Sequence, residues 1–192
     1  MVLPEAVLFP HALMPLFIFE PRYRAMLSHA LERERMFCVA MLKPGVTEAR
    51  TEGDFFHTAG LGMVRACVTH EDGTSHLVLQ GLARVCLGTL VQEGPFRIAE
   101  VQELPVEKTD VDEIDQLCAA VRTSCADLSS SDVSAHEMLN EQLAQVNDPG
   151  VLCDIVAHTF LQSSRHQQSI LEEVDVAARL RRVLQCLQER KN

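Results

Sequence analysis

Apolar residues gather in one stretch near the start of the chain, VLFPHALMPLFIFEPRYRAML at 7–27. Strand-forming residues dominate Val7 to Phe19, but Pro10 and Pro15 cannot donate hydrogen bonds to a neighbouring strand and must lie at edges or bends. We therefore expect two short buried strands joined by a kink. Glu20-Pro21 then predicts the start of a helix, because proline at the first helical position loses no hydrogen bond.

The rest of the first half has the alternating pattern of strands and turns. A continuous apolar run at Met36–Leu42 predicts a central strand, and Lys43 to Phe55, which has no periodicity, predicts a surface loop where recognition residues could lie. Asp72-Gly73 lies between two alternating segments and predicts a tight hairpin, since glycine readily adopts the positive backbone angle of such a turn. With a last strand at Phe96–Leu104, the first half has about six or seven strands and one helix.

Beyond Leu104-Pro105 the apolar residues recur at intervals of three and four, which is the period of helices. Met138 and Thr159 are among the positions expected on the inner faces of these helices. The expected helices are, in order, one from a cap near Asp110 to a break at Ser129–Asp132, one over about Asp132 to Val146, one from Asn147-Asp148-Pro149, one at Ser163–Glu173 and one from the cap Asp175.

A strand-rich half followed by a helical half indicates an α+β fold rather than an alternating α/β sheet. We expect two consecutive lobes, a β lobe at 1–105 and an all-α helical bundle at 106–192. With 192 residues, 47% of them hydrophobic, the chain is long enough to bury a core in each lobe.

The sequence also bears on the compartment. The longest uncharged stretch, Ala6 to Phe19, contains two prolines and is too short to span a bilayer as a helix. The start of the chain lacks the positive charge of a secretory signal. Seven scattered cysteines, an odd number, do not form the pattern of a disulfide framework. We therefore expect a reduced, cytoplasmic protein without a membrane segment.

Acidic residues outnumber basic ones by 27 to 17, which gives a net charge of -10. The imbalance is greatest over Glu103–Asp148, where 11 acids accompany only Lys108 and Arg122, a local charge of -9. Such a surface repels phosphate backbones, whose neutralisation provides much of the affinity for nucleic acids. We expect no nucleic-acid partner.

No motif for catalysis, a cofactor or a metal is found in the sequence. The nearest cysteines, Cys118 and Cys125, are two helical turns apart and have no histidine at ligand spacing. A metal site would require histidines 136, 158 and 166, on three predicted helices, to converge. Phosphate-binding loops, nucleophile elbows and serine-lysine dyads are absent, and nothing marks any cysteine as an activated nucleophile. We therefore assign no catalytic, cofactor-binding or metal-binding residue.

A group of polar residues at the expected helix start, Glu20, Arg22, Tyr23 and Arg24, is a further candidate site. A helix start collects such residues without any function, and arginine can clamp neighbouring loops. We interpret this group as structural.

Five segments distributed along nearly the whole chain form a family pattern. They are VLFPHALMPLFIFEPRYR at 7–24, GLGMVRAC at 60–67, DGTSHLVLQGLARVCL at 72–87, NDPGVLCDIVAH at 147–158 and QQSILEEVDVAARLRRVL at 167–184. In this order they resemble the N-terminal, substrate-binding domain of the ATP-dependent Lon protease, and IFEPRYR is most similar to free-standing bacterial Lon-domain proteins. The resemblance implies a PUA-like, pseudo-barrel β lobe followed by a helical bundle.

In Lon proteases this domain helps to hold substrates and to assemble the ring, while an AAA+ module hydrolyses ATP and a serine-lysine module cuts. This chain stops where the domain would end, so we expect neither of those modules. The resemblance implies a non-catalytic module that recognises unfolded or apolar polypeptide segments. We also expect no cofactor and allow for weak self-association.

Contacts with polypeptides are expected from the loop Lys43 to Phe55 and from the cleft between the lobes, although the sequence assigns no individual binding residue. Two other classes of function are kept as alternatives. One is a hydrolase or small-molecule enzyme with an unrecognised site, and the weaker one is PUA-like RNA binding.

Overall fold

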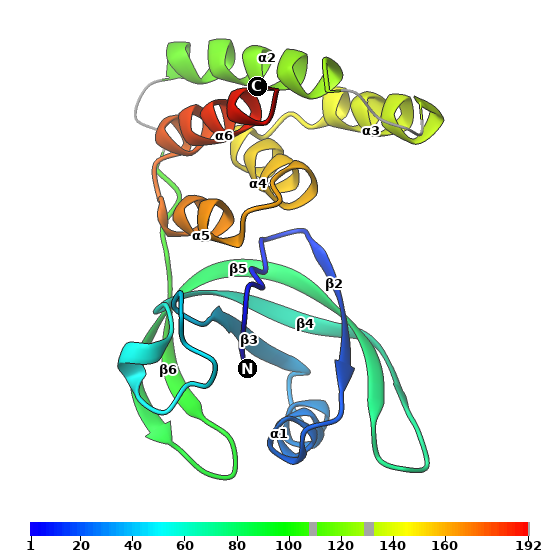
Figure 1. The fold of residues 1–192 in the computed structure, drawn as a ribbon, viewed down its shortest axis with the longest axis vertical. Coiled ribbons are helices and arrows are strands. Elements are labelled where there is room, and N and C mark those ends of the chain that lie inside the picture. The colour runs from blue at the N-terminus through cyan, green and yellow to red at the C-terminus, as the bar shows by residue number, and fades with distance from the viewer. Residues whose placement is uncertain (108–110, 129–132, 192) are drawn as a thin grey trace. The chain divides into compact units, whose positions relative to one another are not determined.

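The computed structural model of the chain describes residues 1–107, 111–128 and 133–191. The chain divides into two compact units, Met1–Leu104 and Pro105–Asn192. The first is built on a sheet and the second on helices (Figure 1), which is the expected α+β class. The expected cap at Asp110 and the expected break at Ser129–Asp132 lie outside the described residues.

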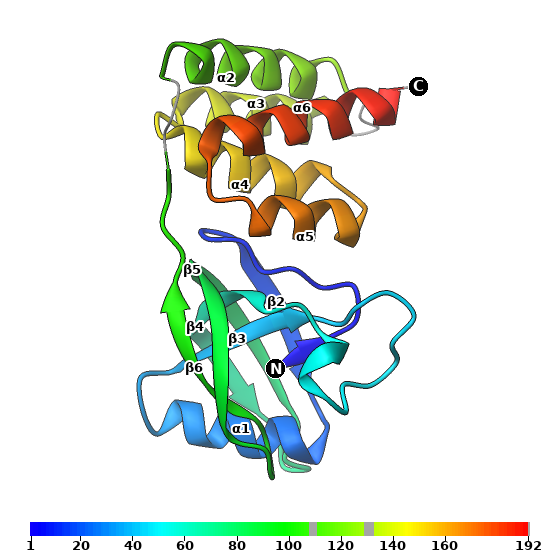
Figure 2. The same ribbon diagram turned by 90° about the vertical axis from the view of Figure 1, so that its left-hand side faces the viewer.

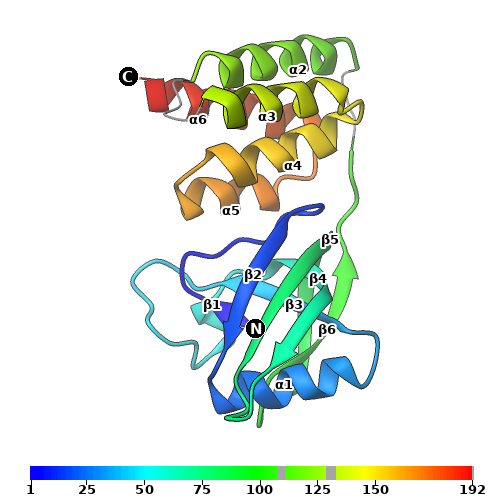
Figure 3. The same ribbon diagram turned by 90° about the vertical axis from the view of Figure 1, so that its right-hand side faces the viewer.

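In the described part of the chain, six strands form the sheet of the first unit. Their order is β1-β3-β4-β5-β2, and β6 also pairs with β5. The pair β1–β3 is parallel and the other pairs are antiparallel. The strands are β1 (Val2–Leu3), β2 (Leu13–Ile18), β3 (Met36–Met41), β4 (Thr58–Thr69), β5 (Ser75–Gln92) and β6 (Ile98–Glu103). The long strand β5 pairs with β2 through its first part and with β6 through its last (Figure 3).

The opening apolar segment differs from the prediction of two buried strands. Only Leu13–Ile18 is a strand, and Leu8 and Phe9 are fully buried in backbone that belongs to no strand. The chain turns at His11, which has a left-handed backbone (φ 66°) and donates its N–H to the Gly81 carbonyl over 2.9 Å. Pro15 is accommodated because β2 is an edge strand of the sheet.

Helix α1 (Pro21–Leu31) begins at the predicted proline and lies across one end of the strands (Figure 2). Its buried side chains pack into one core with side chains of β3, β4 and β5, and each large apolar side chain buried in this way contributes about 1.5–3 kcal/mol to stability. This core includes Tyr23, Met26, Leu27 and Ala30 from α1, and Phe37, Val39, Val64, Leu77 and Leu79 from the strands.

The predicted hairpin between β4 and β5 is confirmed. Gly73 has the positive backbone angle that the turn requires (φ 79°), and the Asp72 carboxylate accepts a hydrogen bond from the Thr74 N–H over 2.9 Å. This hydrogen bond and one from the Thr74 side chain lower the pKa of the Asp72 carboxyl. The guanidinium of Arg24 lies directly against Gly73, where a Cβ would collide with it.

The second unit contains helices α2 (Val111–Ala126), α3 (Val133–Gln145), α4 (Pro149–Phe160), α5 (Ser164–Glu172) and α6 (Val176–Lys191). Helix α6 is central, because it contacts α2, α4 and α5 (Figure 2). The predicted cap Asp148 is confirmed, since its carboxylate accepts the N–H groups of Gly150 and Val151. The expectation that Met138 and Thr159 face inward is wrong, as both are exposed. No helix in the described ranges combines the length and the apolar character needed to cross a membrane.

Candidate functional site

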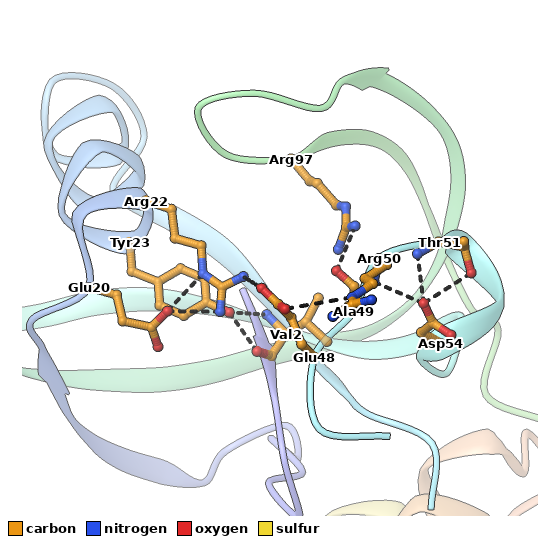
Figure 4. Close-up of polar contacts among 10 residues, drawn as sticks. All are labelled: Val2, Glu20, Arg22, Tyr23, Glu48, Ala49, Arg50, Thr51, Asp54 and Arg97. Atoms are coloured by element: carbon orange, nitrogen blue, oxygen red, sulfur yellow. Dashed lines mark hydrogen bonds and ion pairs between the residues drawn. The ribbon is translucent and has the colours of Figure 1, made fainter. Parts of the chain in front are cut away.

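A pocket of about 390 Å³ lies in the β unit beside the loop that the sequence predicted between Lys43 and Phe55. Its walls come from β1, from the start of α1, from Thr47–Ala49 of the loop and from the turn between β5 and β6. Segments distant in sequence thus converge on one concave site (Figure 4). Pockets of this size commonly hold ligands or the side chains of a bound peptide.

Arg22 connects the start of α1 to the loop. Its guanidinium lies 2.8 Å from the Glu20 carboxylate and 3.9 Å from that of Glu48, so it points between two acids that belong to different elements (Figure 4). It also lies over the Tyr23 ring, 4.7 Å from the ring centroid. These contacts support the interpretation that the polar group at the start of α1 is structural.

Tyr23 fixes the short strand β1. Its hydroxyl donates to the Val2 carbonyl over 2.6 Å and accepts the Val2 N–H over 3.3 Å. Burial raises the pKa of Tyr23, so the phenol stays protonated and remains a hydrogen-bond donor throughout the physiological range.

The loop itself is held at two points. Arg97, from the turn before β6, donates to the Ala49 carbonyl over 2.9 Å, and Figure 4 shows its guanidinium pointing at that oxygen. The Asp54 carboxylate accepts the N–H groups of Arg50 and Thr51 over 2.8 and 2.6 Å, and these bonds lower its pKa. The pocket is therefore largely preformed by contacts within the protein.

A second, more apolar cavity of about 260 Å³ adjoins this pocket and shares Phe96 and Arg97 with it. Cys38 lies on its wall, and burial raises the pKa of this thiol. A nucleophilic cysteine requires the opposite shift, because the thiolate is the reactive form. Cys38 is therefore not an activated nucleophile.

The buried start of the chain leads to a prediction about pH. The Met1 amino group donates to the Cys38 carbonyl over 2.8 Å, and burial, helped by Arg22 and Arg97, lowers its pKa from 8.0 to about 6. The unfolded chain therefore binds more protons between these values, so the free energy of unfolding should rise by roughly 2–3 kcal/mol as the pH increases from 6 to 8. Urea unfolding at a series of pH values measures this rise, and acetylation of the amine should abolish it. An acetylated protein with an unchanged pH slope would contradict the assignment.

The outer face of the β2–β5–β4 part of the sheet carries large exposed apolar side chains. Cross-strand register places Phe17, His76 and Val68 side by side, and Pro15, Val78 and Ala66 next to them. The exposed fractions are 49% for Phe17, 58% for Phe19 and 62% for Val68. The Phe17 ring stacks on His76 and on Phe19, with centroids 4.6 and 5.8 Å apart. We call this surface, with its hollow of about 450 Å³, the apolar sheet face.

The sequence did not reveal this surface. Val7–Phe19 was expected to be buried, whereas Leu13, Phe17 and Phe19 point to solvent. The stretch is apolar at nearly every position, so its pattern cannot indicate which side of the strand is covered. Only the pairing of β2 with β5 identifies the exposed side.

The histidines and cysteines considered from the sequence are dispersed. Cys118 and Cys125 are buried on α2, His158 is on α4 with its pKa lowered by burial, and the side chain of His136 lies outside the described residues. One grouping was missed. His166 of α5 lies close to Cys186 and Glu189 of α6, and the only trace of it in the sequence is a cysteine and a glutamate three positions apart on one helix.

A family model described as the ATP-dependent protease La (LON) substrate-binding domain matches residues 1–189. The chain belongs to this family. It is therefore a substrate-binding module that resembles the Lon N-terminal domain, as the sequence segments predicted. Neither an ATPase nor a protease module forms part of the match.

The chain is also similar in sequence to Lon proteases. The Lon protease of Desulfosudis oleivorans is 25% identical over 186 residues, which are 95% of this chain and 22% of that protein. The Lon protease of Xanthomonas oryzae pv. oryzae is 29% identical over 187 residues, 93% of this chain and 21% of that protein. The chain thus spans about a fifth of the length of these relatives.

Two solved structures show the same fold. The N-terminal domain of Mycobacterium avium complex Lon protease superposes with a TM-score of 0.77 at 19% identity, covering 98% of this chain and 96% of that one. A Lon N-terminal domain protein from Xanthomonas campestris gives a TM-score of 0.65 at 18% identity, covering 96% and 95%. The predicted arrangement of a β lobe followed by helices is therefore the fold of Lon N-terminal domains.

Proposed function

We propose that this chain binds unfolded or apolar polypeptide segments through the apolar sheet face and performs no chemistry on them. The observation that carries the proposal is the continuous exposed row formed by Phe17, Phe19, His76 and Val68 on a member of a substrate-binding family. Exposed apolar surfaces of this kind mark sites of protein interaction, because leaving them in water costs free energy.

The edge of the sheet favours binding by side chains over addition of a strand. Strand β2 is at the edge, where a partner strand could pair with its backbone. Pro15 lies in the middle of β2 and supplies no N–H, which leaves a gap in the row of donors. The rings of Phe17 and Phe19, which both follow Pro15 in the chain, are exposed, so recognition would depend on apolar side chains of the polypeptide rather than on a fixed backbone register.

The pocket beside the loop contributes less to polypeptide binding than the apolar sheet face does. Its charged groups pair largely with one another, as Arg22 does with Glu20 and Glu48, so little of their charge is left to attract a ligand. We propose that the adjoining apolar cavity receives a single apolar side chain of a polypeptide.

The net charge of -10 opposes the binding of nucleic acids, which we do not expect as partners. All seven cysteines lie in the described ranges and none forms a disulfide, which supports our proposal that the protein works in the reducing cytoplasm. The apolar sheet face also offers a surface for weak self-association at high protein concentration, which a bound polypeptide would suppress.

The experiment measures binding of a fluorescent, reduced and alkylated polypeptide, which cannot fold, by anisotropy. Changing both Phe17 and Phe19 to serine should weaken binding by more than about tenfold, since buried aromatic residues dominate binding surfaces. A polypeptide of the same length with its apolar residues replaced by serine should not bind to the unaltered protein.

The matched control is Val91→Ser. Val91 is also a large apolar residue and is 68% exposed. It lies on β5, as His76 of the apolar sheet face does, but at the other end of that strand. This variant should bind the polypeptide within about twofold of the unaltered protein. Equal weakening by both changes, or no binding by the unaltered protein, would refute the proposal.

A further inference from the structure

Three potential metal ligands meet on the helical unit. His166 of α5 and Cys186 and Glu189 of α6 each offer one ligand atom, and these atoms all lie within 4.8 Å of one another. Helices α5 and α6 run antiparallel and are joined by a short connection at Glu173–Asp175 (Figure 2), so the first turn of α5 lies beside the end of α6. Cys186 and Glu189 are three residues apart and therefore share one side of α6.

The backbone around this group is held by hydrogen bonds, whereas the ligand side chains make few of them. The His166 N–H donates to the Ser163 hydroxyl over 3.3 Å, and the His166 carbonyl accepts from the Ser169 hydroxyl over 2.8 Å. Among the described residues, no hydrogen bond engages the His166 ring. Glu189 accepts one bond, from the Gln185 side chain over 3.0 Å, through one of its two oxygens.

In the described structure, the two neighbouring arginines contact other groups and not the three ligand side chains. Arg182, one turn before Cys186, is directed elsewhere, since it lies 3.4 Å from the Glu173 carboxylate and donates to the Ser169 carbonyl over 3.3 Å. Arg190, beside Glu189, donates to the Phe160 carbonyl over 2.8 Å. A neutral imidazole, a thiolate and a carboxylate together carry two negative charges, which a divalent cation would neutralise.

We propose that His166, Cys186 and Glu189 bind a zinc ion that ties α5 to α6. Nitrogen, sulfur and oxygen ligands together suit Zn²⁺, whereas Mg²⁺ and Ca²⁺ require oxygen ligands. Zinc bonds of about 2.0–2.3 Å place tetrahedral ligand atoms about 3.3–3.8 Å apart, so these side chains need to approach by at most about 1.5 Å. Three protein ligands leave a fourth position for water or for a group from a binding partner.

The site goes beyond polypeptide binding and does not depend on it, because it lies on the helical unit and the apolar sheet face lies on the β unit. His166 and Glu189 are exposed and Cys186 is half-buried, so zinc can enter from solvent.

The test is a titration of the purified chain with Zn²⁺ against a chromophoric chelator, with a parallel titration with Co²⁺. We expect one equivalent of tightly bound metal and a sulfur-to-cobalt charge-transfer absorption. Changing Cys186 to serine should abolish that absorption and weaken zinc binding by at least about tenfold. His166→Gln and Glu189→Gln should weaken binding while keeping the absorption, and Mg²⁺ should not compete.

Cys67→Ser is the matched control, because Cys67 is a half-buried cysteine of β4 in the other unit. It should keep the full affinity and the cobalt spectrum. Zinc should raise the thermal midpoint of the unaltered protein but not that of Cys186→Ser, and the two metal-free proteins should melt alike. Equal loss of binding in the Cys67 and Cys186 variants, or no binding by the unaltered chain, would overturn the proposal.

Discussion

Replacing Asp154 by alanine is expected to lower the free energy of unfolding by about 3–5 kcal/mol. Asp154 of α4 pairs with Arg179 of α6 over 3.1 Å, and the two residues are only 3% and 0% exposed. Without the carboxylate, the buried guanidinium of Arg179 would lose the negative charge that lies 3.1 Å from it, and water could not replace that charge. Urea unfolding followed by circular dichroism measures the loss directly.

A second ion pair in the helical unit serves as the control. Arg181 of α6 pairs with Glu113 of α2 at the surface, so Glu113→Ala removes the same kind of contact where water can solvate the arginine left behind. Its effect should be much smaller than that of Asp154→Ala. Changing Asp154 to alanine together with Arg179→Met should restore much of the lost stability, because no buried charge remains. Equal losses from Asp154→Ala and Glu113→Ala would show that burial does not determine the effect.

Features set by neighbouring residues could be predicted from the sequence. Helices α1 and α4 begin at Pro21 and Pro149 as expected, because a proline at the helix start and the carboxylate of Asp148 act within a few residues. The hairpin at Asp72-Gly73 formed for the same reason. Each of these signals is local, so no knowledge of the rest of the fold was needed.

Features set by distant partners were not predictable in this way. Leu8 and Phe9 have the composition of a strand, but their position is set by strands β4 and β5, whose residues are 50 to 80 positions further along the chain. Met138 was expected to be inward because it fits the helical stripe, and it is exposed because no neighbouring element covers it in the described structure. Periodicity identifies a helix or strand but not the surfaces that surround it.

The candidate sites also combine features set by neighbouring residues with features set by distant ones. The loop Lys43 to Phe55 could be predicted, yet its role as a wall of the pocket depends on Arg22 and Arg97, which reach it from other elements. The apolar sheet face and the grouping of His166 with α6 arise only when separate segments meet. Sequence reasoning therefore identified the family and the class of function, whereas the surfaces that carry binding required the structure.

The second large effect is expected from Gly60→Ala, which should lower the free energy of unfolding by about 3 kcal/mol or more. A Cβ at Gly60 in β4 would lie 2.0 Å from the Leu8 carbonyl oxygen and 2.7 Å from the Leu8 Cβ. Leu8 is fully buried and Gly60 is paired on both sides, with Val39 and with Arg84, so neither backbone can move away cheaply.

Gly88→Ala is the control, because a Cβ at Gly88 approaches Glu100 only to 3.6 Å, which is an ordinary contact. This variant should keep the free energy of unfolding within about 1 kcal/mol of that of the unaltered protein. Thermal and urea unfolding of both variants would decide the matter, and a Gly60→Ala protein as stable as Gly88→Ala would show that Leu8 does not pack against β4 as described.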